Sequence, residues 1–145
     1  MECAYGSNRA DDVRRPWPTV IHNAGFLATA SGRLVLADRP ELLEALRSRS
    51  LPRLTRYTAT GWGHLARSVD AARGDRLAVE NEQSLLGYNC LAAGVYGRDG
   101  TLVGAVGVVG RTGAFVAERL RRPVREAAAQ LSLIMAAAPP DPGGR

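Results

Sequence analysis

Residues 88–110 read "YNCLAAGVYGRDGTLVGAVGVVG", and this stretch decides the fold. Two apolar runs of small and β-branched residues flank Asp99-Gly100, and an Asp-Gly pair between such runs is a strong hairpin signal. If Asp99-Gly100 is the two-residue loop of a type I′ turn, the register of the two strands follows directly. The predicted cross-strand partners on one face are Cys90 with Val109, Ala92 with Gly107, Gly94 with Ala105, and Tyr96 with Val103.

The two faces of this predicted hairpin differ in bulk. Alternation along each strand places Leu91, Val106 and Val108 together on one face, which is bulky enough to dock a helix from about residue 115 to 135. The opposite face, called the small face below, carries little beyond methyl groups, one thiol and bare backbone: Cys90, Ala92, Gly94, Ala105, Gly107 and Val109.

Something must cover the small face, because protein interiors do not tolerate unfilled volume. Glycine within a strand often marks the close approach of another group. Two interpretations remain open, and both can hold at once. A helix of small residues over 27–37 packs closely on the face, or a small molecule enters beside that helix.

Bulk composition excludes several classes of protein. The chain has 145 residues, which is one domain by size, with a net charge of +5. Its basic residues are all arginine and are interspersed with acids, which indicates a solvated surface rather than a nucleic-acid contact. Cys3 and Cys90 are too few and too far apart for a disulfide framework or a metal site. With no signal peptide and no membrane span, we expect a cytoplasmic protein without a cofactor.

The remaining chain predicts helices on a mainly antiparallel sheet, an α/β (α+β) fold. The first 24 residues read as irregular, with a short edge strand around 19–21, and residues 136–145 as a disordered tail. The domain between them is predicted over 25–135. Its expected elements are a helix over 27–37, a second from Pro40, a third from Trp62 capped by Gly74, a strand over 76–79, a loop over 80–86, the hairpin, and a last helix over 115–135. The buried stripe expected on that last helix is Val116, Leu120, Val124, Ala127, Ala128 and Leu131.

Several pieces in this order resemble the C-terminal effector-binding domain of the IclR family of bacterial transcriptional regulators. They are "LATASGRLVLA", the segment from "LTRYTATGWGHLARSVDAARGD" through the Gly-x-x-Cys of the hairpin to "VGVVG", and the closing "ERLRRPVREAAAQLS". The likeness covers roughly residues 24–134. It implies a GAF-like domain, in which helices flank a curved, mainly antiparallel sheet. We expect the first helix and strand of that domain to be missing here.

The resemblance also implies a function. The domain would bind a small organic or aromatic acid as effector and associate as a dimer or tetramer, or pair with full-length relatives. The chain carries no segment like the family's winged helix-turn-helix, so we expect no direct nucleic-acid contact. The contacts carried over by position are Ala30, Ser31, Glu80, Tyr88, Cys90, Gly107 and Val109, and strand alternation adds Ala92 on the same small face.

One departure bears on the ligand. Where relatives that hold small carboxylates present serines, this chain has Gly107 and Val109. A buried carboxylate without hydroxyl donors is costly, so we expect a larger or more apolar ligand, or none.

Two other functions compete with this interpretation. Cys90 with His22 or His64 could form a nucleophile and base, but nothing fixes either histidine nearby, so we do not expect an enzyme. The stronger alternative is an oligomerisation module that binds no ligand and pairs with full-length regulators. Bulky residues on the small face would favour pure assembly, whereas their absence favours a pocket.

Overall fold

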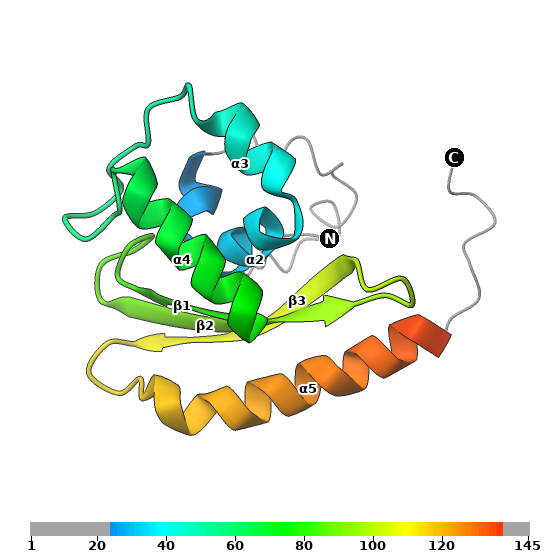
Figure 1. The fold of residues 1–145 in the computed structure, drawn as a ribbon. Helices are drawn as coiled ribbons and strands as arrows, with labels where there is room; N and C mark the ends of the chain where they lie inside the picture. The colour runs from blue at the N-terminus through cyan, green and yellow to red at the C-terminus, as the bar shows by residue number, and fades with distance from the viewer. Residues whose placement is uncertain (1–23, 138–145) are drawn as a thin grey trace, which may run out of the picture.

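The computed structural model describes residues 24–137 as helices on both faces of a three-stranded antiparallel sheet (Figure 1). Three α-helices cover one face and one long helix covers the other, which confirms the predicted mixture of helices and antiparallel strands. The predicted strand at 19–21 and most of the predicted tail lie outside the described residues. The elements are η2 (Ala24–Ala28), α2 (Ala30–Asp38), α3 (Pro40–Leu46), α4 (Trp62–Asp75), β1 (Leu77–Asn81), β2 (Tyr88–Tyr96), β3 (Leu102–Arg111) and α5 (Ala117–Ala137).

The sheet has the order β1-β2-β3, and the predicted hairpin register is confirmed over most of its length. Cys90 pairs with Val109, and the same register continues to the pair Val95–Gly104. At Tyr96 the register shifts by one residue. Tyr96 therefore pairs with Leu102, so the predicted partner Val103 is wrong.

The predicted type I′ turn is also wrong. Only Gly100 has a positive φ, 80°, whereas a type I′ turn requires one at both central residues. The amide of Gly100 instead donates to the carbonyl of Gly97 at 3.1 Å, and the Asp99 carboxylate accepts from the amide of Thr101 at 3.1 Å. The loop is therefore longer than two residues, which accounts for the register shift at Tyr96.

The bulky face of the hairpin packs on α5, as predicted. Leu91 and Val95 form a buried cluster with Val124 and Ala128 of the helix. The predicted stripe is wrong at its two ends, because Val116 is 47% exposed and Leu131 is 41% exposed. Pro123 lies inside α5, and the helix continues through it (Figure 1).

The opposite face of the sheet is covered by α2, which lies between the sheet and α4 (Figure 1). A helix between two layers is buried on most sides, and Leu34 and Leu36 are each 1% exposed. The predicted helix over 27–37 thus exists, but its first residues form η2 and the α-helix begins at Ala30. Pro40 occupies the first turn of α3, as predicted.

The end of α4 differs from the prediction. Gly74 lies within the helix, which continues to Asp75, and Arg76 adopts the left-handed conformation with φ of 51°. Within residues 24–137, no helix is long and apolar enough to cross a lipid bilayer.

Candidate functional site

The start of α2 is fixed by local hydrogen bonds and a close backbone approach. The hydroxyl of Thr29 donates to the carbonyl of Phe26 at 2.8 Å and accepts from the amide of Gly32 at 3.0 Å. A Cβ atom on Gly32 would lie 1.9 Å from the Phe26 carbonyl oxygen, so only glycine fits here. The "TASG" of this segment therefore sets where α2 begins, which in turn places Ala30 and Arg33 over the sheet.

The small face is closed at its hairpin end by the protein's own side chains. A Cβ atom on Gly94 would lie 2.6 Å from the Tyr96 hydroxyl and 2.8 Å from a methyl of Leu102, so these side chains already occupy that space. Ala92, in the middle of the face, is 3% exposed in the same buried cluster as α2. Close helix packing thus explains this half of the small face.

The other end of the small face is open. Gly107 is exposed and Val109 is 62% exposed. The packing of the strands explains why residue 107 is a glycine. A Cβ atom there would lie 2.7 Å from the carbonyl oxygen of Leu91 on the neighbouring strand. The glycine permits the close approach of β2 and β3, and the surface beside Val109 stays exposed.

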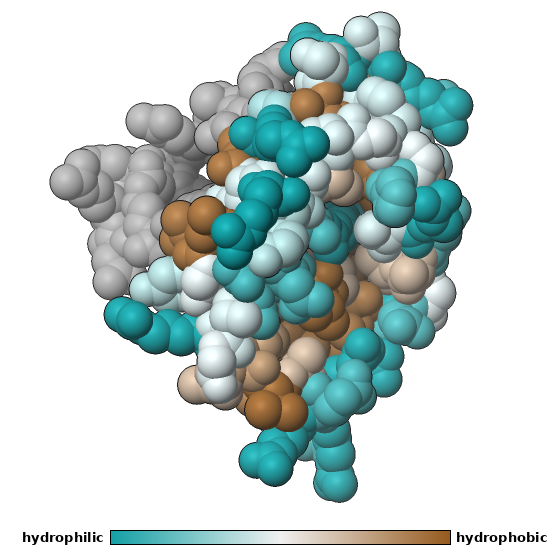
Figure 2. Space-filling view, turned by 90° about the vertical axis from the view of Figure 1, so that its left-hand side faces the viewer, coloured by the Kyte–Doolittle hydropathy of each residue, from teal (hydrophilic) through white to brown (hydrophobic). Residues whose placement is uncertain are grey.

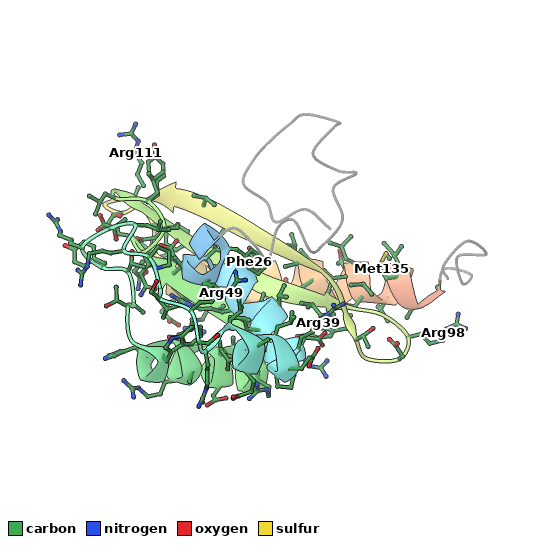
Figure 3. The ribbon with its side chains drawn as sticks, turned by 90° about the horizontal axis from the view of Figure 1, so that it is seen from above. Phe26, Arg39, Arg49, Arg98, Arg111 and Met135 are labelled. Carbon is green, nitrogen blue, oxygen red and sulfur yellow. The ribbon has the colours of Figure 1, made fainter. Side chains whose placement is uncertain are left out.

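Tyr88 and Arg111 lie at the open end. They are cross-strand partners, and the guanidinium of Arg111 lies 5.9 Å from the centre of the Tyr88 ring. Figure 3 shows Arg111 at the end of β3 opposite to the hairpin, where Arg98 lies. An aromatic ring, a cation and an apolar valine therefore share this end of the sheet.

Figure 2 looks onto the end of the molecule where β1 joins β2 and β3 leads into α5. Brown apolar patches lie there among teal polar side chains. The exposed large apolar residues on those two connections are Leu85, Leu86 and Val116.

Glu80 lies on β1 and pairs with Cys90 on β2, but its carboxylate bonds to the loop that follows β1. Its side chain is buried, with 2% exposed, and Oε1 accepts hydrogen bonds from the amides of Ser84, at 2.8 Å, and Gln83. The carboxylate thus holds the loop that follows β1. The sequence pattern predicted a loop from residue 80 on, whereas in the structure Glu80 belongs to strand β1.

Arg33 is a buried cation that the sequence reasoning did not name. It is 4% exposed, and its guanidinium donates to the carbonyl of Val79 at 2.5 Å and to the side chain of Gln83. Its Nε atom is buried and has no hydrogen-bond partner among the described residues. Burial lowers the pKa of Arg33, and electrostatic interactions with Glu80 and, to a smaller extent, Cys90 oppose this shift.

The structure brings most of the predicted site residues to one region. Cys90 and Val109 lie on the small face, Tyr88 precedes Cys90 by two residues on β2, and Glu80 pairs with Cys90 across the sheet. Ala30 is fully buried and Ser31 is half-buried at the start of α2. Within residues 24–137, no three His, Cys, Asp or Glu side chains are grouped as a metal site would require.

The family model described as "Bacterial transcriptional regulator IclR C-terminal" matches residues 24–133. The chain therefore belongs to the IclR family of bacterial transcriptional regulators, in the part that forms their C-terminal domain. The relatives are regulators rather than enzymes, in agreement with the expectation that this chain is not an enzyme.

Three relatives illustrate the similarity. The HTH-type transcriptional repressor AllR of Klebsiella pneumoniae is 28% identical over 117 residues, which are 77% of this chain and 43% of AllR. The C-terminal domain of the E. coli regulator KdgR has a TM-score of 0.68 at 28% identity, covering 77% of this chain and 71% of that one. The inducer-binding domain of PobR from Acinetobacter, a double mutant in complex with 3-hydroxybenzoic acid, has a TM-score of 0.66 at 26% identity, covering 74% and 65%. The chain thus spans less than half of the AllR repressor.

Proposed function

We propose that this chain is the small-molecule sensing domain of an IclR-type regulator, and that it binds an organic or aromatic acid at the open end of the small face in the cytoplasm. The observation that carries the proposal is the exposure of Val109. A valine on the inner face of a strand is 62% exposed, although the same face is buried under α2 only a few residues away. Exposed apolar surface beside polar groups is typical of a binding site.

The chemistry of this end supports an aromatic acid. Val109 and the Tyr88 ring offer apolar surface to a ring, and the Arg111 guanidinium can pair with a carboxylate. Within residues 24–137, Arg111 forms no ion pair with an acidic side chain. Gly107 and Val109 carry no hydroxyl donor for a carboxylate. Arg111 would supply hydrogen-bond donors in their place. The 3-hydroxybenzoic acid bound to PobR is a ligand of this class.

The proposal includes no direct DNA contact by the described domain. Some of its arginines are paired with acids on their own helices, as in Glu44–Arg47, Asp70–Arg73 and Glu118–Arg121. Such pairs offset part of the positive charge on these helices, whereas DNA binding is favoured by unpaired, clustered cations. Ligand binding would act on DNA only by changing how domains associate.

A thermal-shift measurement tests this function with 3-hydroxybenzoate as the probe. We expect the melting temperature of the chain to rise with ligand concentration, because a ligand that binds only the folded state stabilises it. Val109→Trp should fill the open end and abolish the shift, and Arg111→Ala should weaken binding by about ten- to a hundredfold through loss of a charge-assisted hydrogen bond.

The matched control is Val103→Trp, at an exposed position near the hairpin end of the same strand. It should keep the wild-type shift. An equal shift in the Val109→Trp protein would show that the ligand binds elsewhere. If no organic or aromatic acid produced a shift, the second candidate would be favoured.

That second candidate is an assembly module that binds no ligand and pairs with full-length regulators. The observation in its favour is the exposed apolar surface at the C-terminal end of α5, where Leu133 is 73% exposed and Ile134 is 63% exposed. Assembly and ligand sensing can coexist, because this surface lies away from Val109.

A further inference from the structure

A groove of about 480 Å³ lies between β2, the end of α4 and the second half of α5. Its apolar surface comes from small residues of the strand and the long helix, together with one leucine: Ala93, Gly94, Ala128, Ala129 and Leu133. Ala93 belongs to the buried cluster between the sheet and α5, so the groove lies on the face of the sheet opposite to Val109. The proposed function makes no use of this concave surface.

Two arginines line the groove where α4 ends. Arg76 adopts the left-handed conformation directly after the helix, and its carbonyl accepts a hydrogen bond from the amide of Gly94 at 3.0 Å. Its guanidinium lies 4.4 Å from the centre of the Tyr96 ring. The guanidinium of Arg125 on α5 donates to the carbonyl of Asp75 at 3.3 Å. The second cation is therefore held beside the residue that precedes Arg76, at the same part of the groove.

These two cations have no acidic partner. Within residues 24–137, no carboxylate lies within ion-pair distance of Arg76 or Arg125. Asp75 also lines the groove, but its carboxylate lies 4.0 Å from Arg121. Two like charges on a partly apolar surface favour the binding of an anion between them. The groove thus combines an apolar floor with a cationic end.

We propose that this groove binds a medium-chain fatty acid anion, with its carboxylate at Arg76 and Arg125 and its alkyl chain along the alanines towards Leu133. Arginine donors suit a carboxylate, and methyl-lined walls suit an alkyl chain. Arg125 and Leu133 are two turns apart on α5. That separation is about 12 Å at 1.5 Å per residue, the length of an extended alkyl chain of about eight to ten carbons.

The size of the groove favours a small molecule over a protein partner. Pockets for small ligands enclose about 300–1,000 Å³, and this groove falls within that range. A stable protein interface buries about 1,200 Å² or more, which needs a much larger surface. Leu133 is 73% exposed and continues the apolar surface away from the cations. A chain molecule can use this whole length, whereas a compact aromatic acid would contact only part of it.

The groove lies far from the proposed effector site, so the inference does not rest on the proposed function. Figure 3 shows Met135, near the end of α5, beside the hairpin and Arg111 at the opposite end of β3. Variants at one site can therefore be made without altering the other.

The test is isothermal titration calorimetry of the complete chain with decanoate, below the concentration at which decanoate forms micelles. We expect one decanoate to bind per chain. Acetate has only the carboxylate and 1-octanol only an uncharged chain, so each should bind at least about tenfold more weakly.

Charge variants test the cationic end. Arg76→Gln combined with Arg125→Gln should weaken decanoate binding by about ten- to a hundredfold through loss of charge-assisted hydrogen bonds. The matched control combines Arg67→Gln with Arg119→Gln, at two exposed positions outside the groove. It removes the same net charge and should bind decanoate as the wild type does.

A bulky residue tests the apolar floor. Ala129→Trp should fill the groove and remove most of the decanoate affinity, and the position is exposed, so the fold should tolerate the change. Gln130→Trp places the same side chain one residue further on, outside the groove, and should keep the wild-type affinity. Circular dichroism checks that every variant folds.

Several results would overturn the proposal. Decanoate could fail to bind, or could bind the double variant at Arg76 and Arg125 as tightly as the wild type. Equal affinity of the Ala129→Trp and Gln130→Trp proteins, or of 1-octanol and decanoate, would do so as well. Loss of binding in Val109→Trp alone would place the fatty acid at the effector site instead. A missing thermal shift with 3-hydroxybenzoate would count against the proposed function only.

Discussion

The guanidinium of Arg33 on α2 donates a hydrogen bond of 2.5 Å to the carbonyl oxygen of Val79 on β1. The same side chain reaches Gln83 in the loop after the strand. One buried cation therefore fastens a helix to the strand and the loop beside it. Because Glu80 accepts hydrogen bonds from the amides of the same loop, Arg33 and Glu80 together order the segment that follows β1.

We expect Arg33→Met to destabilise the fold by about 1–3 kcal/mol, because it leaves the partly buried Val79 carbonyl and Gln83 side chain without their donor. The measurement is the free energy of unfolding from urea denaturation. Arg67→Met, at an exposed position on α4, is the control and should change stability by less than about 0.5 kcal/mol. Equal stability of the two variants would mean that the hydrogen bonds of Arg33 only offset the free-energy cost of burying its charge.

Glu80→Ala should loosen the loop after β1, because the amides of Gln83 and Ser84 lose their acceptor. We expect faster amide hydrogen exchange over residues 82–87 and a loss of about 1–3 kcal/mol of stability. Glu80→Gln keeps an acceptor oxygen and should have a smaller effect on both. Unchanged exchange in the alanine variant would show that the loop is held by other contacts.

Arg33 shows what the sequence could and could not predict at the site. A charged residue on a helix is usually exposed, and only the position of α2 between the sheet and α4 buries this one. A signal was nevertheless present, because Arg33 shares the helical spacing of Ala30, Leu34 and Ala37, which all face inward. The hairpin register could be predicted, since alternation and the Asp-Gly pair depend on neighbours in sequence. The turn type could not, because the bonds of Asp99 and Gly97 select a longer loop.

Gly107 shows a second limit of prediction from the sequence. The sequence indicated that the small face lacks large side chains, but it did not show why, and the structure gives two different reasons. At Gly107 the backbone of β2 comes too close for a Cβ atom, and at Gly94 the Tyr96 side chain folds over the glycine. Only the folded structure distinguishes a glycine required by the chain itself from one that leaves room for a ligand. Leucine at Gly107 would therefore disturb the sheet rather than simply fill a pocket.

Gly107→Ala should accordingly destabilise the domain by about 1–3 kcal/mol, since the new methyl group would lie 2.7 Å from the Leu91 carbonyl oxygen and force the strands apart. The matched control is Gly113→Ala, where no atom lies within 4 Å of the added Cβ. That control should change stability by no more than about 0.5 kcal/mol. Urea denaturation of both variants compares them directly, and equal stabilities would show that the strands adjust at no cost.

The last prediction concerns Tyr96, which folds over Gly94 at the closed end of the small face. Burial raises the pKa of the Tyr96 hydroxyl above its ordinary value of 10.0, Arg76 at 4.4 Å from the ring opposes this shift, and Asp38 adds to it. A raised pKa in the folded state means that the folded protein resists ionisation more than the unfolded chain does. The resulting stability is complete below pH 10.0 and is lost as the pH rises through the folded value.

Tyr96→Phe should therefore lose less stability than the wild type as the pH is raised above about 10. The measurement is the free energy of unfolding of both proteins at a series of alkaline pH values, with ultraviolet absorbance to follow tyrosine ionisation. Arg76→Gln provides a second check, because removing the cation should move ionisation of Tyr96 to still higher pH. If the wild type and Tyr96→Phe lost stability in parallel, the phenol would be titrating as it does in the unfolded chain.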